Sequence, residues 1–363
     1  MIKTVNEDYQ TKQRQVEDLS RTYDIEPQKV WVIDMQRASV NLRDPPRELL
    51  PKDLKNKFQF ATLVMESKGV KFTTSETSVS QSLFTPYDVI STKNEERFDL
   101  EYDNIPIPFE GLKLLEIFGS PPLYYFPLKY NKENRNGFAH LIVNPYEDCS
   151  KRCKPCARLP HFKERCGNEE ENLSYIADGV FNLVGSSEDI KLVQISTGST
   201  INAESDLKLY EKIISFFNNK GFSNCDYSVS SSNIEEKKHM LLLKEMGVTH
   251  FIPKVETTSL ESTALFSTQK RPLSEVIDML NIAEDIFPYI SINIMLGYED
   301  KEQLKQNLEK IAEETNITIK YCIPRIYSED QLNILHPSAK NLEYFVELCK
   351  FIEKKFVIRK DYS

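Results

Sequence analysis

The N-terminal third of the chain has an irregular pattern of hydrophobic and polar positions that favours short strands. The continuous apolar run at residues 30–33 predicts a short buried strand after a polar start of weak helical periodicity. Phe58 to Met65 and Val70 to Thr74 flank Lys68-Gly69, which is typical of a hairpin. We therefore expect a β-rich N-terminal domain at residues 1–136, and no motif in it indicates its role.

After a polar linker that ends at Gly137, short apolar runs alternate with amphipathic helical segments. Strands that alternate with helices of about 10 to 15 residues predict a parallel sheet. We count six such units, too few for a closed eight-stranded barrel. The expected fold class is α/β, a partial (β/α)6 TIM-like barrel at residues 137–335. The expected strands are Phe138 to Val143, Leu192 to Ser196, Tyr227 to Ser230, Phe251 to Val255, Ile290 to Leu296 and Ile319 to Ile323.

Helix boundaries have recognisable signals in this region. Asn233 is expected to cap a helix that Gly247 closes, and Asp300 is expected to cap the helix that contains Leu304. Residues 336–363 form a separate C-terminal segment, in which a helix from Asn341 to Phe356 is expected to pack on the barrel.

Composition and charge limit the class of protein. The 363 residues are 40% hydrophobic and 28% charged, which is typical of a globular chain. Lys plus Arg number 46 and Asp plus Glu 55, a net charge of −9 that argues against nucleic acid as a partner. No run of about 18 apolar residues and no signal peptide are apparent. We expect a cytoplasmic protein without a membrane partner.

A cysteine cluster directly follows the first expected strand. Cys149, Cys153 and Cys156 have the spacing C-x3-C-x2-C, and three thiolates on one loop can converge on a metal centre. Three ligands on a four-iron cube leave one iron open, and an open metal position is typical of catalysis. The other cysteines, Cys166, Cys225, Cys322 and Cys349, are scattered and are expected to be buried structural thiols.

Zinc is the alternative metal. Cys153, Cys156, His161 and Cys166 have the C-x2-C-x4-H-x4-C spacing of a zinc knuckle, and basic residues nearby would suit a phosphate backbone. Against this, the loop lacks the glycine and the exposed aromatic residue of a knuckle, and Cys149 would have no role.

The three cysteines at the end of the first strand of a six-unit β/α region resemble the radical S-adenosylmethionine (radical SAM) superfamily. The resemblance covers about residues 138–330 and is nearest to the biotin synthase and hydrogenase-maturase branch. It implies that these cysteines bind a [4Fe–4S] cluster whose open iron chelates S-adenosylmethionine. It also implies that one electron from the cluster cleaves this cofactor to a 5′-deoxyadenosyl radical. One departure is Pro155, where the family often has an aromatic residue that packs on the adenine.

The resemblance also implies cofactor-binding residues at the later strand ends. The second strand ends in a glycine turn similar to the one that holds the methionyl amino group, and the third in a polar turn. After the fourth strand, Glu256-Thr257 resembles the Glu-Thr pair of the biotin synthase branch. Arg271 would pair with the methionyl carboxylate, and Arg325 would reach the mouth of the barrel. The full set is Ser196, Thr197, Gly198, Ser230, Asn233, Glu256, Thr257, Arg271 and Arg325.

The sequence leaves the substrate open. A small molecule is favoured because no basic channel and no recognisable peptide-binding module appear. A peptide or protein maturase is an alternative enzyme, since the N-terminal domain can be a binding part. A non-catalytic zinc-knuckle protein that binds nucleic acid is the alternative from another class, and a cluster used only for electron transfer is a third. The radical interpretation implies a reducing partner such as a flavodoxin or ferredoxin.

Overall fold

The computed structural model divides the chain into two compact units, which are described separately. The N-terminal unit comprises residues 1–122 and 323–350, and the barrel unit comprises residues 123–322 and 351–363. The described residues are 9–38, 40–43, 60–67, 70–77, 87–91, 98–102, 105–107, 112–119, 124–125, 139–145, 149–156, 169–184, 187–266, 271–324 and 332–356.

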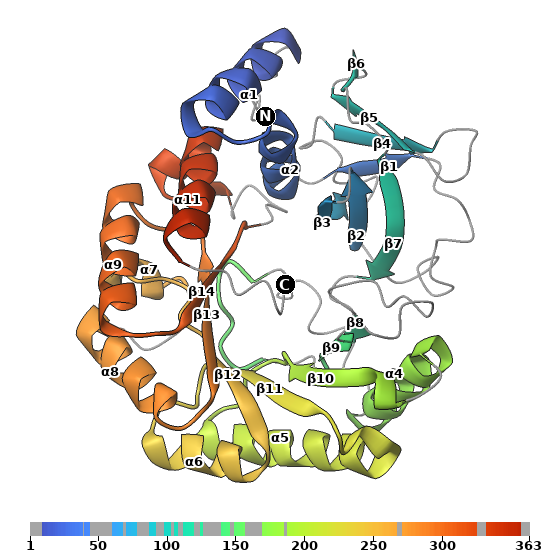
Figure 1. The fold of residues 1–363 in the computed structure, drawn as a ribbon, viewed down its shortest axis with the longest axis vertical. Helices are drawn as coiled ribbons and strands as arrows, with labels where there is room; N and C mark the ends of the chain where they lie inside the picture. The colour runs from blue at the N-terminus through green and yellow to red at the C-terminus, as the bar shows by residue number, and fades with distance from the viewer. Residues whose placement is uncertain are drawn as a thin grey trace. The chain divides into compact units, whose positions relative to one another are not determined.

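The barrel unit contains the predicted parallel sheet, which curls into a half-barrel (Figure 1). Its strand order β14-β13-β12-β11-β10-β9-β8 follows the chain, and the six strands from β9 to β14 are parallel. The predicted partial barrel and all six predicted strands are therefore confirmed. The sequence did not indicate β8, which pairs antiparallel with β9. The bounds are β8 (Tyr124–Tyr125), β9 (Ala139–Val143), β10 (Ile190–Ile195), β11 (Asp226–Ser231), β12 (Val248–Pro253), β13 (Tyr289–Met295) and β14 (Thr318–Cys322).

Helices line the convex side of this sheet (Figure 1). In β13, Ile290, Ile292 and Ile294 are buried and alternate with the half-buried Ser291 and Asn293. Since successive side chains of a strand point to opposite faces, the apolar row faces the helices and the polar row faces the concave side. The helices are α4 (Glu169–Val184), α5 (Ala203–Phe217), α6 (Lys237–Glu245), α7 (Leu260–Thr263), α8 (Leu273–Glu284) and α9 (Lys301–Glu314).

Two of the three predicted helix-end signals are confirmed. Asp300 caps α9 by accepting hydrogen bonds from the amides of Glu302 and Gln303, and Gly247 follows α6 with a φ of +92°. The third prediction was wrong, because α6 has Glu236 at its N-cap. Asn233 instead donates to a buried carboxylate, which needs donors more than an exposed helix end does.

The described part of the N-terminal unit contains α1, α2, most of α11 and two small sheets. The hairpin of β2 with β3 is confirmed, and β7 pairs antiparallel with the other edge of β2. The second sheet has the order β1-β4-β5-β6. The bounds are α1 (Tyr9–Tyr23), α2 (Pro27–Ala38), β1 (Asn41–Arg43), β2 (Phe60–Ser67), β3 (Val70–Thr77), β4 (Tyr87–Ser91), β5 (Phe98–Tyr102), β6 (Ile105–Pro106) and β7 (Lys113–Gly119), and the C-terminal helix is α11 (Leu342–Lys355).

The strand predicted at residues 30–33 was wrong, since these residues lie in α2. All residues from Val30 to Met35 are buried, so this helix is covered on every side and lacks a polar stripe. A short apolar run of this kind has no periodicity that separates a helix from a strand. The C-terminal helix is confirmed as α11, and its residues up to Lys350 belong to the N-terminal unit.

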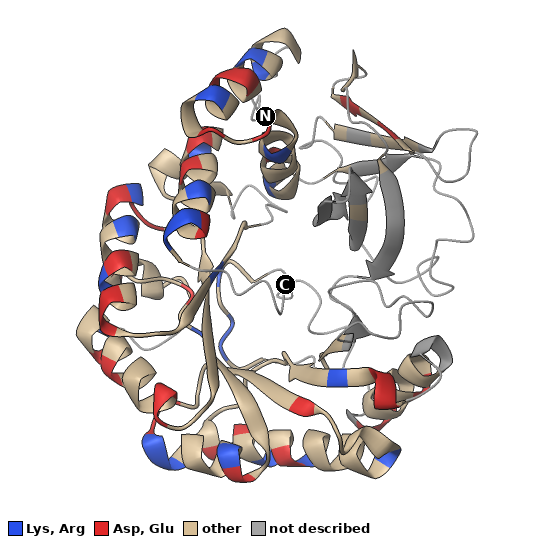
Figure 2. Ribbon diagram, viewed as in Figure 1, with Lys and Arg blue, Asp and Glu red and all other residues tan. Residues whose placement is uncertain are grey.

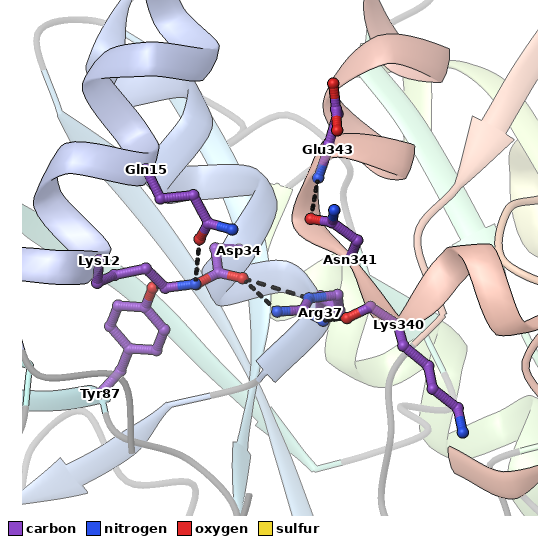
Figure 3. Close-up of polar contacts among 8 residues, drawn as sticks. All are labelled: Lys12, Gln15, Asp34, Arg37, Tyr87, Lys340, Asn341 and Glu343. Atoms are coloured by element: carbon purple, nitrogen blue, oxygen red, sulfur yellow. Dashed lines mark hydrogen bonds and ion pairs between the residues drawn. The ribbon is translucent and has the colours of Figure 1, made fainter. Parts of the chain in front are cut away.

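A buried ionic cluster fixes α1 and α2 to β4 (Figure 3). The carboxylate of Asp34 pairs with Lys12 at 2.9 Å and with Arg37 at 2.8 Å, and the hydroxyl of Tyr87 donates to it. Lys12 also donates to Gln15. Burial by itself raises the pKa of Asp34, but the charges of Arg37 and Lys12 outweigh it and hold this pKa well below its usual range. Every polar group named here has a partner, so we assign the cluster a structural role.

Candidate functional site

The cysteine loop begins after β9, and two of its amides donate hydrogen bonds to segments that follow β10 and α7. The amide of Ser150 donates to the carbonyl of Ser199, beyond β10, at 2.8 Å. The amide of Lys154 donates to the carbonyl of Leu265, just after α7, at 2.8 Å. Arg152 has a φ of +49°, which turns the chain between the first two cysteines. The loop is thus fixed at the C-terminal edge of the parallel sheet.

The three cysteines of this loop are free thiols and half-buried. The Sγ of Cys149 accepts a hydrogen bond from the amide of Ser199 at 3.3 Å, and the Sγ of Cys153 donates to the carbonyl of Phe266 at 2.7 Å. Burial raises the pKa of Cys153 to about 12, and the negative charges of Glu256, Cys156 and Cys149 add to the effect. The three sulfurs are therefore electrostatic neighbours that repel one another as anions, and a bound cation is needed to keep them all as thiolates.

The donor set of the loop consists of three thiols. Among the described residues, no group of three or more His, Cys, Asp or Glu side chains is arranged around one metal ion. In a four-iron cube each thiolate binds a different iron, so the sulfurs need only surround the cube. The two further residues of the alternative zinc site, His161 and Cys166, lie outside the described residues.

The ends of β10 and β11 are joined through a buried carboxylate on α5. Asp206 is fully buried, and its Oδ1 accepts from the amide and the hydroxyl of Thr200, each at 2.7 Å. Its Oδ2 accepts from Asn233 at 3.0 Å and from Ser231 at 3.3 Å. Because these four donors come from two strand ends, Asp206 fixes the turns in which the resemblance places cofactor-binding residues.

Several predicted residues lie at this joined edge. Ser196 donates its amide to the carbonyl of Val143 at 2.9 Å, which aligns the end of β10 with the strand that precedes the cysteines. Thr197 and Gly198 are buried in the following turn. Ser230 is buried at the end of β11. The contacts of this turn with the cysteine loop come from the adjacent Ser199, and a role of the four predicted residues in holding a cofactor stays a prediction.

Glu256 lies just past β12. Its carbonyl accepts from the amide of Met295, at the end of β13, at 2.8 Å, but its buried Oε2 has no hydrogen-bond partner among the described residues. Burial raises the pKa of this carboxyl to about 7, against the smaller opposing effects of Lys254 and Lys151. An ammonium group placed at Oε2 would relieve this energetic cost.

The residues after Glu256 are held by a second buried carboxylate. Glu299 accepts from the amide of Thr258 and, at 2.7 Å, from its hydroxyl. Asn307 donates to the same hydroxyl at 2.9 Å. Thr257, the other half of the predicted Glu-Thr pair, is buried between these anchored positions. The turn after β12 is therefore rigid on both sides of Thr257.

A pocket beside the ends of β11 and β12 includes the predicted Arg271. Its lining also includes Ser232, Lys254, Glu256 and Thr257. Arg271 forms an ion pair with Glu235, another residue of the lining. The guanidinium thus already has one carboxylate partner, and its pairing with a cofactor carboxylate stays a prediction. Arg325 lies outside the described residues.

Sequence reasoning missed the residues that support the site. Ser199 and Ser232 share a buried hydroxyl hydrogen bond of 2.6 Å, and the buried carboxylates of Asp206 and Glu299 hold the turns after β10, β11 and β12. Asp206 had one weak signal, an acidic residue on the first turn of an otherwise apolar helix face. The expectation for the other cysteines holds in part, because Cys349 is buried, Cys225 is half-buried and Cys322 is exposed.

The comparisons give only distant similarity. No protein-family model matches this sequence, and no curated protein matches it. Among solved structures, it is similar to coproporphyrinogen III oxidase from Escherichia coli, described as a radical SAM enzyme, at 12% identity and a TM-score of 0.36 over 59% of this chain and 51% of the other. The FeFe-hydrogenase maturase HydG from Carboxydothermus hydrogenoformans matches at 12% identity and a TM-score of 0.42, over 59% of this chain and 51% of the other. SuiB of Streptococcus suis, solved with S-adenosylmethionine bound, matches at 10% identity and a TM-score of 0.39, over 62% of this chain and 51% of the other.

The matched regions span about half the length of these solved chains. The assignment of the site therefore rests on the residues and contacts of this chain. Within the described residues, no helix is long and apolar enough to cross a membrane.

Proposed function

We propose that this chain is a radical SAM enzyme in which Cys149, Cys153 and Cys156 bind a [4Fe–4S] cluster and S-adenosylmethionine occupies its open iron. When bound, the reduced cluster supplies one electron that cleaves the cofactor to methionine and a 5′-deoxyadenosyl radical, which abstracts hydrogen from a substrate. One observation carries the proposal: the loop of the three thiols is hydrogen-bonded to Ser199, past β10, and to Leu265 and Phe266, while Glu256, just past β12, has a buried Oε2 without a hydrogen-bond partner among the described residues.

In this proposal the residues of the chain bind and orient the cofactor. The Oε2 of Glu256 accepts a hydrogen bond from the methionyl amino group of S-adenosylmethionine, which provides the partner that Oε2 lacks among the described residues. The turn of Thr197 and Gly198, held in place through Asp206 and Thr200, presents backbone groups to the methionyl part. The amide of Ser199, which donates to Cys149, stabilises a thiolate ligand and tunes the potential of the cluster.

The substrate in this proposal is a small molecule, and the electron comes from a partner such as a flavodoxin or ferredoxin. A peptide or protein maturase is the second candidate, distinguished by a macromolecular substrate. A zinc knuckle would leave Cys149 without a role, although this sulfur already accepts a hydrogen bond beside the other two cysteines. A cluster that only transfers electrons would leave Glu256 without its partner.

The test is anaerobic reconstitution with iron and sulfide, followed by metal analysis and a search for 5′-deoxyadenosine. The native chain is expected to bind about four irons and to form 5′-deoxyadenosine with a reductant present. Cys149→Ala, Cys153→Ala and Cys156→Ala should each lose iron and product. Cys225→Ala is the matched control, since its thiol donates to the carbonyl of Ile190, away from the loop. Colourless protein with one zinc, or iron without 5′-deoxyadenosine, would reject the proposal.

A further inference from the structure

The concave face of the sheet has a row of polar residues that the proposed cofactor site does not use. The strand register places Gln194 beside Ser228, Ser228 beside His250, and His250 beside Tyr289. Paired residues of neighbouring parallel strands share a face, and the stacked rings of His250 and Tyr289, 4.4 Å apart, agree with this register. His140 belongs to the same face, because its Nε2 lies 3.0 Å from the Oε1 of Gln194.

Lys320 adds a positive charge to this face. It pairs in register with Asn293, whose neighbours in β13 place it on the concave side. On the six parallel strands, all of which are described, the charged residues are Lys191, Asp226 and Lys320. Lys191 and Asp226 are exposed at the starts of their strands, whereas Lys320 is half-buried within β14. Figure 2 shows that most charged residues of this unit lie on the helices instead.

The positive charge of Lys320, on the same face of the sheet, acts on both imidazoles. Burial lowers the pKa of His140 to about 4, and the charge of Lys320 contributes. Burial likewise lowers the pKa of His250 to about 4, with Lys320 adding to it and Asp226 opposing it. Both rings are therefore neutral at pH 7. Lys320 forms no ion pair with a described residue, and Cys322 is the one thiol near enough to raise its pKa against the effect of burial.

Lys320 is a half-buried cation on the same face as two neutral imidazoles, and no anion among the described residues forms an ion pair with it. A charge removed from water is costly unless an opposite charge or hydrogen-bond acceptors compensate it. An oxyanion would complete the arrangement, because the ammonium supplies charge and His250 and the Ser228 hydroxyl can supply hydrogen-bond donors. His140 lines the site beside them, with its own N–H donated to Gln194. Asp226, the acidic residue of these six strands, does not neutralise Lys320, since it is exposed at the start of β11.

The depth of this cluster sets the size of a ligand. His140 precedes the end of β9 by three residues, and His250 precedes the end of β12 by three. At about 3.3 Å per residue, the imidazoles lie roughly 10 Å along the strands from the edge that holds the cysteine loop. A molecule that reaches from one to the other has the length of a small metabolite.

We infer that His140, His250 and Lys320 form a subsite for an oxyanion group, a carboxylate or a phosphate, at the far end of a small-molecule substrate. This inference rests on the proposed function, because it takes the other end of that molecule to lie at the cysteine edge. It adds the substrate class: a compound of roughly 10 Å with an anionic group at one end. The subsite favours anions because of Lys320 and selects the length because of its depth.

The test uses the full chain with labelled histidine, titrated with inorganic phosphate and, separately, with acetate at pH 7. Saturable changes in the imidazole signals of His140 and His250 with either anion are expected, and the anion that binds more tightly identifies the group. Lys320→Met should weaken the binding at least about tenfold. In the absence of anion it should also raise the pKa of both imidazoles, which checks that the variant folds with the cluster intact.

Lys208→Met is the matched control, since it removes one exposed lysine of α5 and changes the net charge equally. It should leave the anion response unchanged. No response of His140 and His250 to either anion would overturn the inference, as would equal losses in the two lysine variants. The titration needs neither iron nor S-adenosylmethionine, so anion binding without 5′-deoxyadenosine formation would reject the proposed function alone. Deoxyadenosine formation without anion binding would reject the subsite alone.

Discussion

Ser199 connects the loop of Cys149 to the end of β10 in two ways. Its amide donates to the Sγ of Cys149 at 3.3 Å, and its carbonyl accepts from the amide of Ser150 at 2.8 Å. Its hydroxyl shares a buried hydrogen bond of 2.6 Å with Ser232, after β11. One residue thus joins three successive parts of the sheet edge, and the position of the first thiol depends on backbone groups that any side chain would retain.

Ser199→Ala should lower stability and leave iron binding intact. The substitution removes the hydroxyl and leaves Ser232 without this partner, at an expected cost of about 1 kcal/mol in the free energy of unfolding. Chemical denaturation measures this cost, and metal analysis after reconstitution measures the iron. Loss of iron in this variant would show that the hydroxyl, and not the backbone, positions Cys149.

Asp206→Asn should destabilise the barrel unit by about 2 kcal/mol. The carboxylate accepts four hydrogen bonds, and an amide would turn one acceptor into a donor that faces other donors. Denaturant unfolding measures the loss, and Glu211→Gln, at an exposed position of α5, is the control. If the two variants unfold alike, Asp206 does not support the strand ends.

Glu256→Gln should change how stability depends on pH. Burial raises the pKa of Glu256 to about 7, so the folded chain keeps this proton while the unfolded chain loses it near pH 4.5. The native chain therefore loses stability from this group as the pH rises from 4.5 to 7, by about 3 kcal/mol. The Glu256→Gln variant should not show this loss of stability.

The comparison requires unfolding of the cluster-free chain at several pH values. His140 and His250 also titrate on acidification, so the difference between variant and native chain isolates Glu256. Glu261→Gln, at an exposed position, should follow the native curve. The reconstituted Glu256→Gln variant should also bind S-adenosylmethionine at least about tenfold more weakly. Parallel pH curves would mean that the carboxylate is not buried in solution.

Asp34→Asn should destabilise the N-terminal unit by about 3 kcal/mol, because it leaves Lys12 and Arg37 buried without their anion. The pKa of Asp34 is held below its usual value, so the unfolded chain takes up this proton first as the pH falls. The native chain should therefore lose stability below about pH 4 from this group, and the variant should lose less. Asp18→Asn, in an exposed pair with Arg21, serves as the control and should change little.

The fold of the barrel unit was predictable because its strands and helices alternate with clear periods. Strands such as β13 have buried apolar residues at alternating positions, and capping at Asp300 and the glycine at Gly247 marked helix ends. The N-terminal unit was harder to predict, because α2 is buried on all sides and its apolar run resembles a strand. Local pattern does not separate these two cases.

The candidate site was predictable where spacing reveals it. The cysteines share one loop, and their strand-end partners follow from the rule that parallel strands end at one edge. Asp206, by contrast, lies on a helix and reaches the edge only through its side chain, and Lys320 becomes significant only when β14 is paired with β13. Such long-range placements depend on the register of the sheet, which no local sequence pattern encodes.

The most direct test of the central claim is the EPR spectrum of the reduced, reconstituted chain with and without S-adenosylmethionine. A [4Fe–4S] signal that changes when S-adenosylmethionine is added, and that is absent in Cys153→Ala but retained in Cys225→Ala, is the predicted result. A signal that does not respond to S-adenosylmethionine, or a reconstituted chain without any cluster signal, would contradict the account.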